Sequence, residues 1–194
     1  MCNFFSGIVT KDKTYAGWET DSHEDLIKAA KLDDTTNNPN FVRVEFVPKD
    51  GDIFNHNSDN WVLKVDQDFK PEWFTEKFAK SEMRKNLENF VKERFIVDRE
   101  VDEIKTGRWF LKNGIIRKLC GDAKVGEMRE TSQVGVMMGT SQVGVMWETS
   151  QVGVYNKNVE YKTIKENGMA ILYYKDNPEI IVANKNIKVV VREE

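Results

Sequence analysis

A hexapeptide, Thr-Ser-Gln-Val-Gly-Val, occurs three times in this chain with a period of nine residues, at 131–136, 140–145 and 149–154. A degenerate copy at 122–128 precedes them, and weaker matches extend the period from about residue 113 to at least residue 166. Within the unit the second position is small, the fourth is valine and the seventh is large and apolar. A nine-residue unit is too short to bury its own apolar side chains, so neighbouring units must stack.

The repeat favours a β-solenoid or β-roll. Alternation puts the second and fourth positions on one face of a short strand, and a bend returns the seventh to the same core. The sixth position holds valine three times and Glu127 once, so we expect it to face water. Calcium-binding nonapeptide rolls carry aspartate in their turns. Here the turns are Met138-Gly139, Trp147-Glu148 and Asn156-Lys157, which disfavours a calcium roll. An antiparallel meander of short strands stays open as an alternative.

The first half of the chain has no repeat and mixes strand and helix patterns. Residues 4–10, 14–18, 41–47 and 61–65 have the composition and alternation of strands. Ser22 followed by Asp25 predicts a helix start at 21–25. Pro71 can begin a second helix, which reaches about residue 95 with apolar residues at helical spacing. We therefore predict an α+β domain over residues 1–112, and an all-β solenoid over 113–194 that ends in strands at 169–175, 179–183 and 187–191.

Charge and composition exclude several classes of protein. Lys and Arg number 29 against 32 Asp and Glu, a net charge of -3, which argues against a broad phosphate-binding surface and against nucleic-acid binding as the function. No apolar run approaches the roughly 18–20 residues that span a bilayer, and the first residues lack the features of a secretory signal. Two cysteines cannot form a disulfide framework. The composition predicts a soluble cytoplasmic protein with no membrane partner.

Cys2 is the strongest candidate for a catalytic group. Removal of Met1 would leave an α-amine beside a thiol, and that pair is the nucleophile and base of N-terminal-nucleophile enzymes. His23 is one of two histidines, and a Cys2–His23 pair oriented by Asp21 would favour a thiolate. The alternatives are a buried small residue at position 2 and an ordinary helix start at 21–23.

Other polar residues have weaker functional interpretations. Asp66, Asp68 and Glu72 are an acidic cluster that could bind a hard cation, although a helix N-terminus near Pro71 explains them as well. His56 lies in a polar loop and is expected to be exposed. Cys120 has the character of a lone thiol. The sequence therefore predicts no metal site and no cofactor.

Several short segments carry a resemblance to a known group of proteins. They are the N-terminal Met-Cys-Asn-Phe-Phe-Ser, Asp21-Ser22-His23, the strand at 41–45, and Val65-Asp66-Gln67-Asp68 followed by Pro-Glu-Trp-Phe at 71–74. The chain resembles an uncharacterised family encoded by bacteriophages and bacteria, which has a similar head followed by an array of short repeats. The resemblance implies a viral or mobile-element origin and no known activity. The Val-Gly repeats of this chain differ from the more polar repeats of that family.

Three functions follow as hypotheses. The first is a phage-type accessory protein that binds a host or viral protein through the solenoid. The second is a cysteine-dependent amidohydrolase or transferase that uses Cys2. The third is a structural virion component in which the solenoid mediates assembly, as a homo-oligomer.

Overall fold

The computed structural model describes residues 4–35, 38–154, 160–164 and 169–172. The chain divides into two compact units, Met1–Glu93 and Arg94–Glu194, which we call the head unit and the solenoid unit. The division lies earlier than the predicted boundary at residue 112, because strands that precede the recognisable repeat already pair with the repeat strands.

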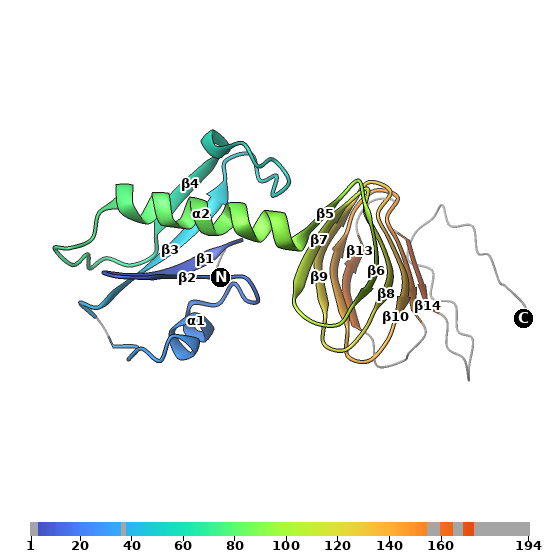
Figure 1. The fold of residues 1–194 in the computed structure, drawn as a ribbon, viewed down its shortest axis with the longest axis horizontal. Helices are drawn as coiled ribbons and strands as arrows, with labels where there is room; N and C mark the ends of the chain where they lie inside the picture. Colours follow the sequence, from blue (N-terminus) through green and yellow to red (C-terminus); the bar gives the residue numbers. More distant parts are fainter. Residues whose placement is uncertain (1–3, 36–37, 155–159, 165–168, 173–194) are drawn as a thin grey trace, which may run out of the picture. The chain divides into compact units, whose positions relative to one another are not determined.

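The head unit is built on a four-stranded antiparallel sheet of order β2-β1-β3-β4 (Figure 1). Its strands are β1 (Ser6–Thr10), β2 (Thr14–Ala16), β3 (Phe41–Pro48) and β4 (Trp61–Val65), with a short 3-10 helix η1 (Ser58–Asn60) before β4. The four predicted strands are confirmed. The first is shorter than predicted because Phe5 has a left-handed backbone, with φ of 63°, and pairing begins only at Ser6.

Two helices accompany this sheet. Helix α1 (His23–Ala29) starts where the sequence predicted, since the Ser22 hydroxyl accepts the backbone N–H of Asp25 at 3.2 Å. Helix α2 (Glu76–Arg94) begins later than predicted. The residues after Pro71 form a turn in which the Phe74 N–H donates to the Pro71 carbonyl at 2.9 Å, and Thr75 then caps the helix by accepting the N–H of Phe78 at 3.3 Å.

The head core is rich in aromatic side chains. Phe90 of α2 packs against Phe5 and Trp18, with ring centroids 5.2 and 5.6 Å apart. Met83 lies before Phe90 on the same helix and covers Gly7 of β1, where a Cβ atom would come within 2.5 Å of the Met83 sulfur. The absent side chain at Gly7 therefore lets α2 pack closely on the sheet.

The solenoid unit consists of two parallel sheets, each with five strands in the described part of the chain (Figure 1). One sheet contains β6 (Glu100–Ile104), β8 (Ile115–Leu119), β10 (Gln133–Met137), β12 (Gln151–Val154) and β14 (Met169–Leu172). The other contains β5 (Phe95–Val97), β7 (Arg108–Lys112), β9 (Lys124–Arg129), β11 (Gln142–Met146) and β13 (Glu160–Ile164). Consecutive strands alternate between the sheets, so a coil of the repeat region contains two nonapeptides. The solenoid prediction is confirmed, and the parallel pairing excludes the antiparallel meander.

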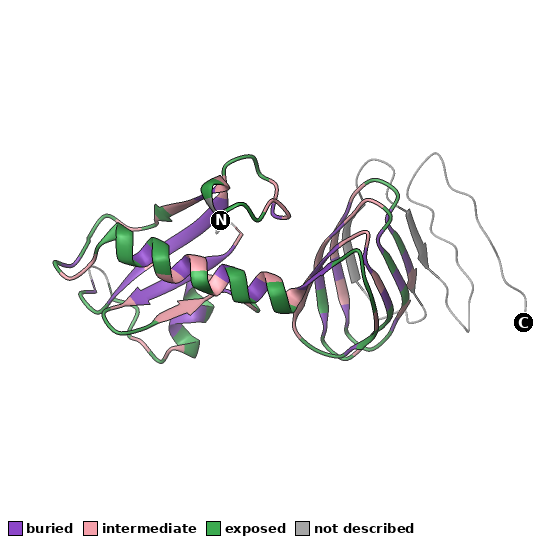
Figure 2. Cartoon of the chain, turned by 45° about the horizontal axis from the view of Figure 1, so that its top comes forward, coloured by how far each residue is buried: buried purple, intermediate pink, exposed green. Residues whose placement is uncertain are grey.

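The interior of the solenoid is a ladder of repeat residues. The fourth-position valines are at most 3% exposed, and they are Val125, Val134, Val143 and Val152. The seventh-position methionines of β9, β10 and β11 are equally buried, as are the second-position serines. Figure 2 shows the same narrow buried band in strand after strand. The sixth-position Val136 and Val145 are half-buried, which agrees with an outward position.

The turns between strands use left-handed backbone conformations at regular intervals. Gly121 and Gly139 have φ of 61° and 71°, and Glu130 and Glu148 have φ of 56° and 57°. Each pair is separated by one coil, so glycine turns and glutamate turns alternate along the chain. Glutamate is an unfavourable residue for this conformation, whereas glycine adopts it freely.

Candidate functional site

The predicted catalytic histidine, His23, is buried at the start of α1, with 2% of its surface exposed. Its Nε2 lies 3.0 Å from the carbonyl oxygen of Val44, and its Nδ1 lies 3.2 Å from Oδ2 of Asp66. Because a carbonyl only accepts, the hydrogen of this contact must be on Nε2. The ring therefore ties α1 to β3 and to the residue after β4.

The other two predicted catalytic residues are Asp21 and Cys2. Asp21 lies in the segment before the N-cap of α1, and Cys2 lies outside the described residues. The structure thus brings His23 together with Asp66, and the proposed pairing of His23 with Cys2 stays a prediction.

The predicted acidic cluster is divided among different environments. Asp66 contacts His23, Glu72 lies in the turn before α2, and Asp68 lines a polar hollow of about 340 Å³. In that hollow Arg43 pairs with Asp34. Among the residues that the structure describes, no group of three or more His, Cys, Asp or Glu is arranged to hold a metal ion.

Cys120 is partly exposed and lies at a turn of the solenoid. Its Sγ is 3.5 Å from the carbonyl oxygen of Ile104 and 3.7 Å from Oε1 of Glu103. Both neighbours are hydrogen-bond acceptors, so they suit a protonated thiol that donates.

A cluster of ion pairs lies on the outer face of β6 and β8, which are neighbouring strands of one sheet. Glu100, Asp102 and Glu103 of β6 lie beside Arg117 and Lys118 of β8. Hydrogen bonds from Lys118, at 2.7 Å, and from Lys105, at 2.9 Å, lower the pKa of Glu103 from its ordinary value of 4.5 to about 2. The acidic residues of β6 are therefore balanced by the basic residues of β8 and by Lys105.

Beyond these strands the repeat strands β10 and β11 carry no charged side chain, although Gln142 and Val145 of β11 lie beside Lys124 and Glu127 of β9. The outward residues of β10 are Gln133, Gly135 and Val136, and β11 presents the same three residue types at its equivalent positions. A Cβ atom on Gly135 would lie 2.8 Å from the Arg117 carbonyl oxygen, and one on Gly144 would lie 2.6 Å from that of Gly126. Only glycine fits without a shift of the backbone, so a strip of bare main chain lies between the glutamine and valine columns.

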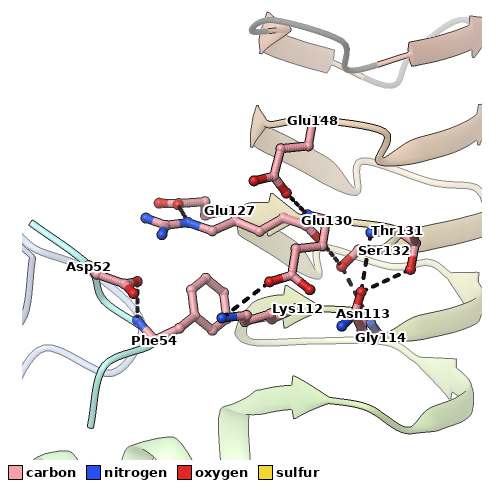
Figure 3. Close-up of polar contacts among 11 residues, drawn as sticks. Asp52, Phe54, Lys112, Asn113, Gly114, Glu127, Glu130, Thr131, Ser132 and Glu148 are labelled. Atoms are coloured by element: carbon pink, nitrogen blue, oxygen red, sulfur yellow. Dashed lines mark hydrogen bonds and ion pairs between the residues drawn. The ribbon is translucent and has the colours of Figure 1, made fainter. Parts of the chain in front are cut away.

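Side chains at the turns tie successive coils together (Figure 3). Thr131 Oγ1 donates to Asn113 Oδ1 at 2.9 Å, and Lys112 pairs with Glu130 at 3.3 Å. The Glu130 backbone N–H donates to the carboxylate of Glu148 in the next coil. These contacts stabilise the row of turns at Asn113, Glu130 and Glu148, which both sheets share.

The head unit contains a second hollow, which the sequence did not predict. A hollow of about 160 Å³ is lined by Phe46, His56, Trp61, Arg84, Leu87, Glu88 and Val91. These residues come from β3, the β3–β4 loop, β4 and α2. The spacing of Arg84 and Glu88, one helical turn apart, is visible in the sequence. Their position beside Trp61 depends on the packing of α2 on the sheet.

Neither helix in the described part of the chain has the length and apolar character of a membrane span. Comparisons with protein-family models, with curated proteins and with solved structures found no match to this chain. The function must therefore be argued from the surfaces themselves.

Proposed function

We propose that this chain is an interaction module whose solenoid binds a protein partner. The observation that carries the proposal is the outward Gln–Gly–Val set, which β10 presents on one sheet and β11 on the other and which contains no charged side chain. This set offers the amide groups of glutamine side chains together with apolar contacts from valine. The lack of charged side chains on β10 and β11 suits a protein partner better than a nucleic acid.

The resemblance to a phage-encoded family supports a host or viral protein as the partner. A site of action in the cytoplasm of the host cell is part of the same proposal.

The test is a comparison of bound partners between the intact chain and two variants, Val136→Lys and Val145→Lys. Each places a charge among the outward repeat residues of one sheet without changing a buried residue. Val97→Lys is the matched control, because Val97 is 37% exposed and lies on β5, outside the repeat. We expect proteins retained from infected and uninfected host cells, measured by quantitative mass spectrometry, to be lost with either face variant and kept with the control. Retention by all variants would contradict the proposal.

The enzyme alternative rests on Cys2 and has a separate test. Intact mass spectrometry before and after a thiol-reactive probe at neutral pH reports both the processing of Met1 and the reactivity of each thiol. Loss of Met1 with fast labelling of Cys2 over Cys120 would favour catalysis. A retained Met1, or labelling only after denaturation, would favour the interaction module.

The third possibility, a virion component, makes a different prediction. Sedimentation of the purified chain would then show assemblies that grow with protein concentration and that Val136→Lys or Val145→Lys disrupts.

A further inference from the structure

The hollow in the head unit has an apolar floor. Phe46 and Trp61 are fully buried, and Leu87 is 5% exposed. The indole N–H of Trp61 donates to the Asn55 carbonyl at 2.8 Å, so the ring offers its apolar surface to the hollow. The volume is about 160 Å³, and cavities of about 150 Å³ with apolar walls accommodate a molecule the size of benzene.

The rim of the hollow carries groups of opposite charge. Arg84 and Glu88 line the same hollow from α2, where residues four apart project from one face of a helix. A guanidinium group binds a carboxylate through two parallel hydrogen bonds, and a carboxylate accepts from an ammonium group. The rim therefore matches a small molecule that carries both charges beside an apolar group.

The loop that completes the rim is held by one carboxylate. Asp50 accepts hydrogen bonds from the Asn60 side chain at 2.8 Å, the Asp52 backbone N–H at 2.8 Å and the Asn55 side chain at 2.9 Å. The bond from Asn60, followed by the bonds from Asp52 and Asn55, lowers the pKa of Asp50. This network orders the loop between β3 and β4, which carries His56 to the rim.

We propose that this hollow binds a free α-amino acid with an aromatic side chain. The side chain occupies the space above Trp61, the α-carboxylate pairs with Arg84 and the α-ammonium pairs with Glu88. The site lies wholly within the head unit, so the inference does not rest on the proposed function of the solenoid.

The experiment is a calorimetric titration of the full chain with L-phenylalanine. We expect saturable binding, with affinity reduced about tenfold or more in Arg84→Gln and in Glu88→Gln, because each removes a charge-assisted hydrogen bond. Glu82→Gln and Lys85→Gln are matched controls: these residues form an ion pair at 2.6 Å on the same helix and do not line the hollow. Thermal unfolding of every variant verifies that the head stays folded.

Ligand analogues separate the two charges. Phenylacetate lacks the ammonium group and phenethylamine lacks the carboxylate, and we expect each to bind about tenfold or more weakly than L-phenylalanine. Val91→Phe, which fills the hollow from its partly exposed rim without removing a charge, should abolish binding. The proposal is overturned if L-phenylalanine shows no saturable binding, if either analogue binds as tightly, or if the control variants weaken binding as much as Arg84→Gln and Glu88→Gln do.

Discussion

At the scale of single residues, the turns of the solenoid show how one backbone conformation can be reached by different side chains. Gly139 and Glu130 occupy the same position of the nonapeptide, in turns on the two different edges, and have φ of 71° and 56°. Glycine meets no steric penalty there, whereas an L side chain costs about 1–2 kcal/mol. The Glu130 side chain pairs with Lys112, and its backbone N–H donates to the Glu148 carboxylate. These contacts between coils offset part of the cost of the left-handed backbone.

Replacing Glu130 tests the strain directly. Glu130→Gly and Glu130→Ala both lose the exposed ion pair with Lys112, but only glycine relieves the backbone. We expect Glu130→Gly to be more stable than Glu130→Ala by about 1 kcal/mol in urea unfolding. Gly139→Ala provides the converse case and should destabilise by more than this amount, because its Cβ would in addition lie 2.9 Å from the Gly121 carbonyl oxygen. Equal stability of the two Glu130 variants would contradict this explanation.

Glu103 predicts a pH dependence of stability. Its pKa is lowered from 4.5 to about 2 by hydrogen bonds from Lys118 and Lys105, so the folded state favours the ionised form. The stabilisation is complete above the unfolded-state value of 4.5 and is lost as the pH falls towards 2. The difference in unfolding free energy between the native chain and Glu103→Gln should therefore be constant near neutral pH and shrink over that acid interval. High salt should reduce it at every pH, because the cluster is exposed. A difference that grows on acidification would rule out this assignment.

At the scale of one element, each repeat strand has two unlike faces. In β11, Val143 is 1% exposed and belongs to the interior ladder, whereas Val145 is half-buried on the outer face. The two valines differ only in the side of the strand on which they lie. Their comparison therefore isolates the effect of burial within one element.

Truncation of these two valines should have unequal costs. Val143→Ala leaves a cavity between buried neighbours and should destabilise by about 2 kcal/mol, and Val145→Ala by less than half of that. Chemical denaturation with tryptophan fluorescence measures both. If the outer variant costs as much as the inner one, the orientation of β11 is wrong.

At the scale of the whole molecule, the coil and the nonapeptide are different units. Equivalent residues in one sheet are 18 apart, as in the contact of Thr131 with Asn113. A single nonapeptide therefore contributes to one sheet only. The two edges also differ, since Gly121 and Gly139 occupy one kind of turn and Glu130 and Glu148 the other.

Two deletions test whether the structural repeat is the 18-residue coil or the nonapeptide. Removal of residues 131–148 takes out one full coil and joins Glu130 to Thr149, so every remaining strand keeps its sheet and its type of turn. Removal of 140–148 alone would transfer all later strands to the opposite sheet. We expect the full-coil deletion to unfold at a higher temperature than the shorter deletion, as measured by circular dichroism. The reverse order would show that the two edges are interchangeable.

Local patterns were enough to predict much of this fold. The nine-residue period determined that the repeats stack, that Val143 and its equivalents are inside, and where turns such as Met138-Gly139 lie. Ser22 likewise marked the start of α1. These features depend on neighbours in sequence or on an exact repeat, and both are readable without a structure.

Other features were decided by tertiary contacts. The sequence alone determined a solenoid preceded by an α+β head, but β5, β6 and β7 carry no clear repeat, and only their pairing with later strands makes them part of it. His23 contacts Asp66 because α1 and the end of β4 meet in the folded head. The hollow above Trp61 exists because α2 lies across that strand. Each depends on residues that are far apart in the chain, and their proximity is set by the packing of whole elements, which no local pattern records.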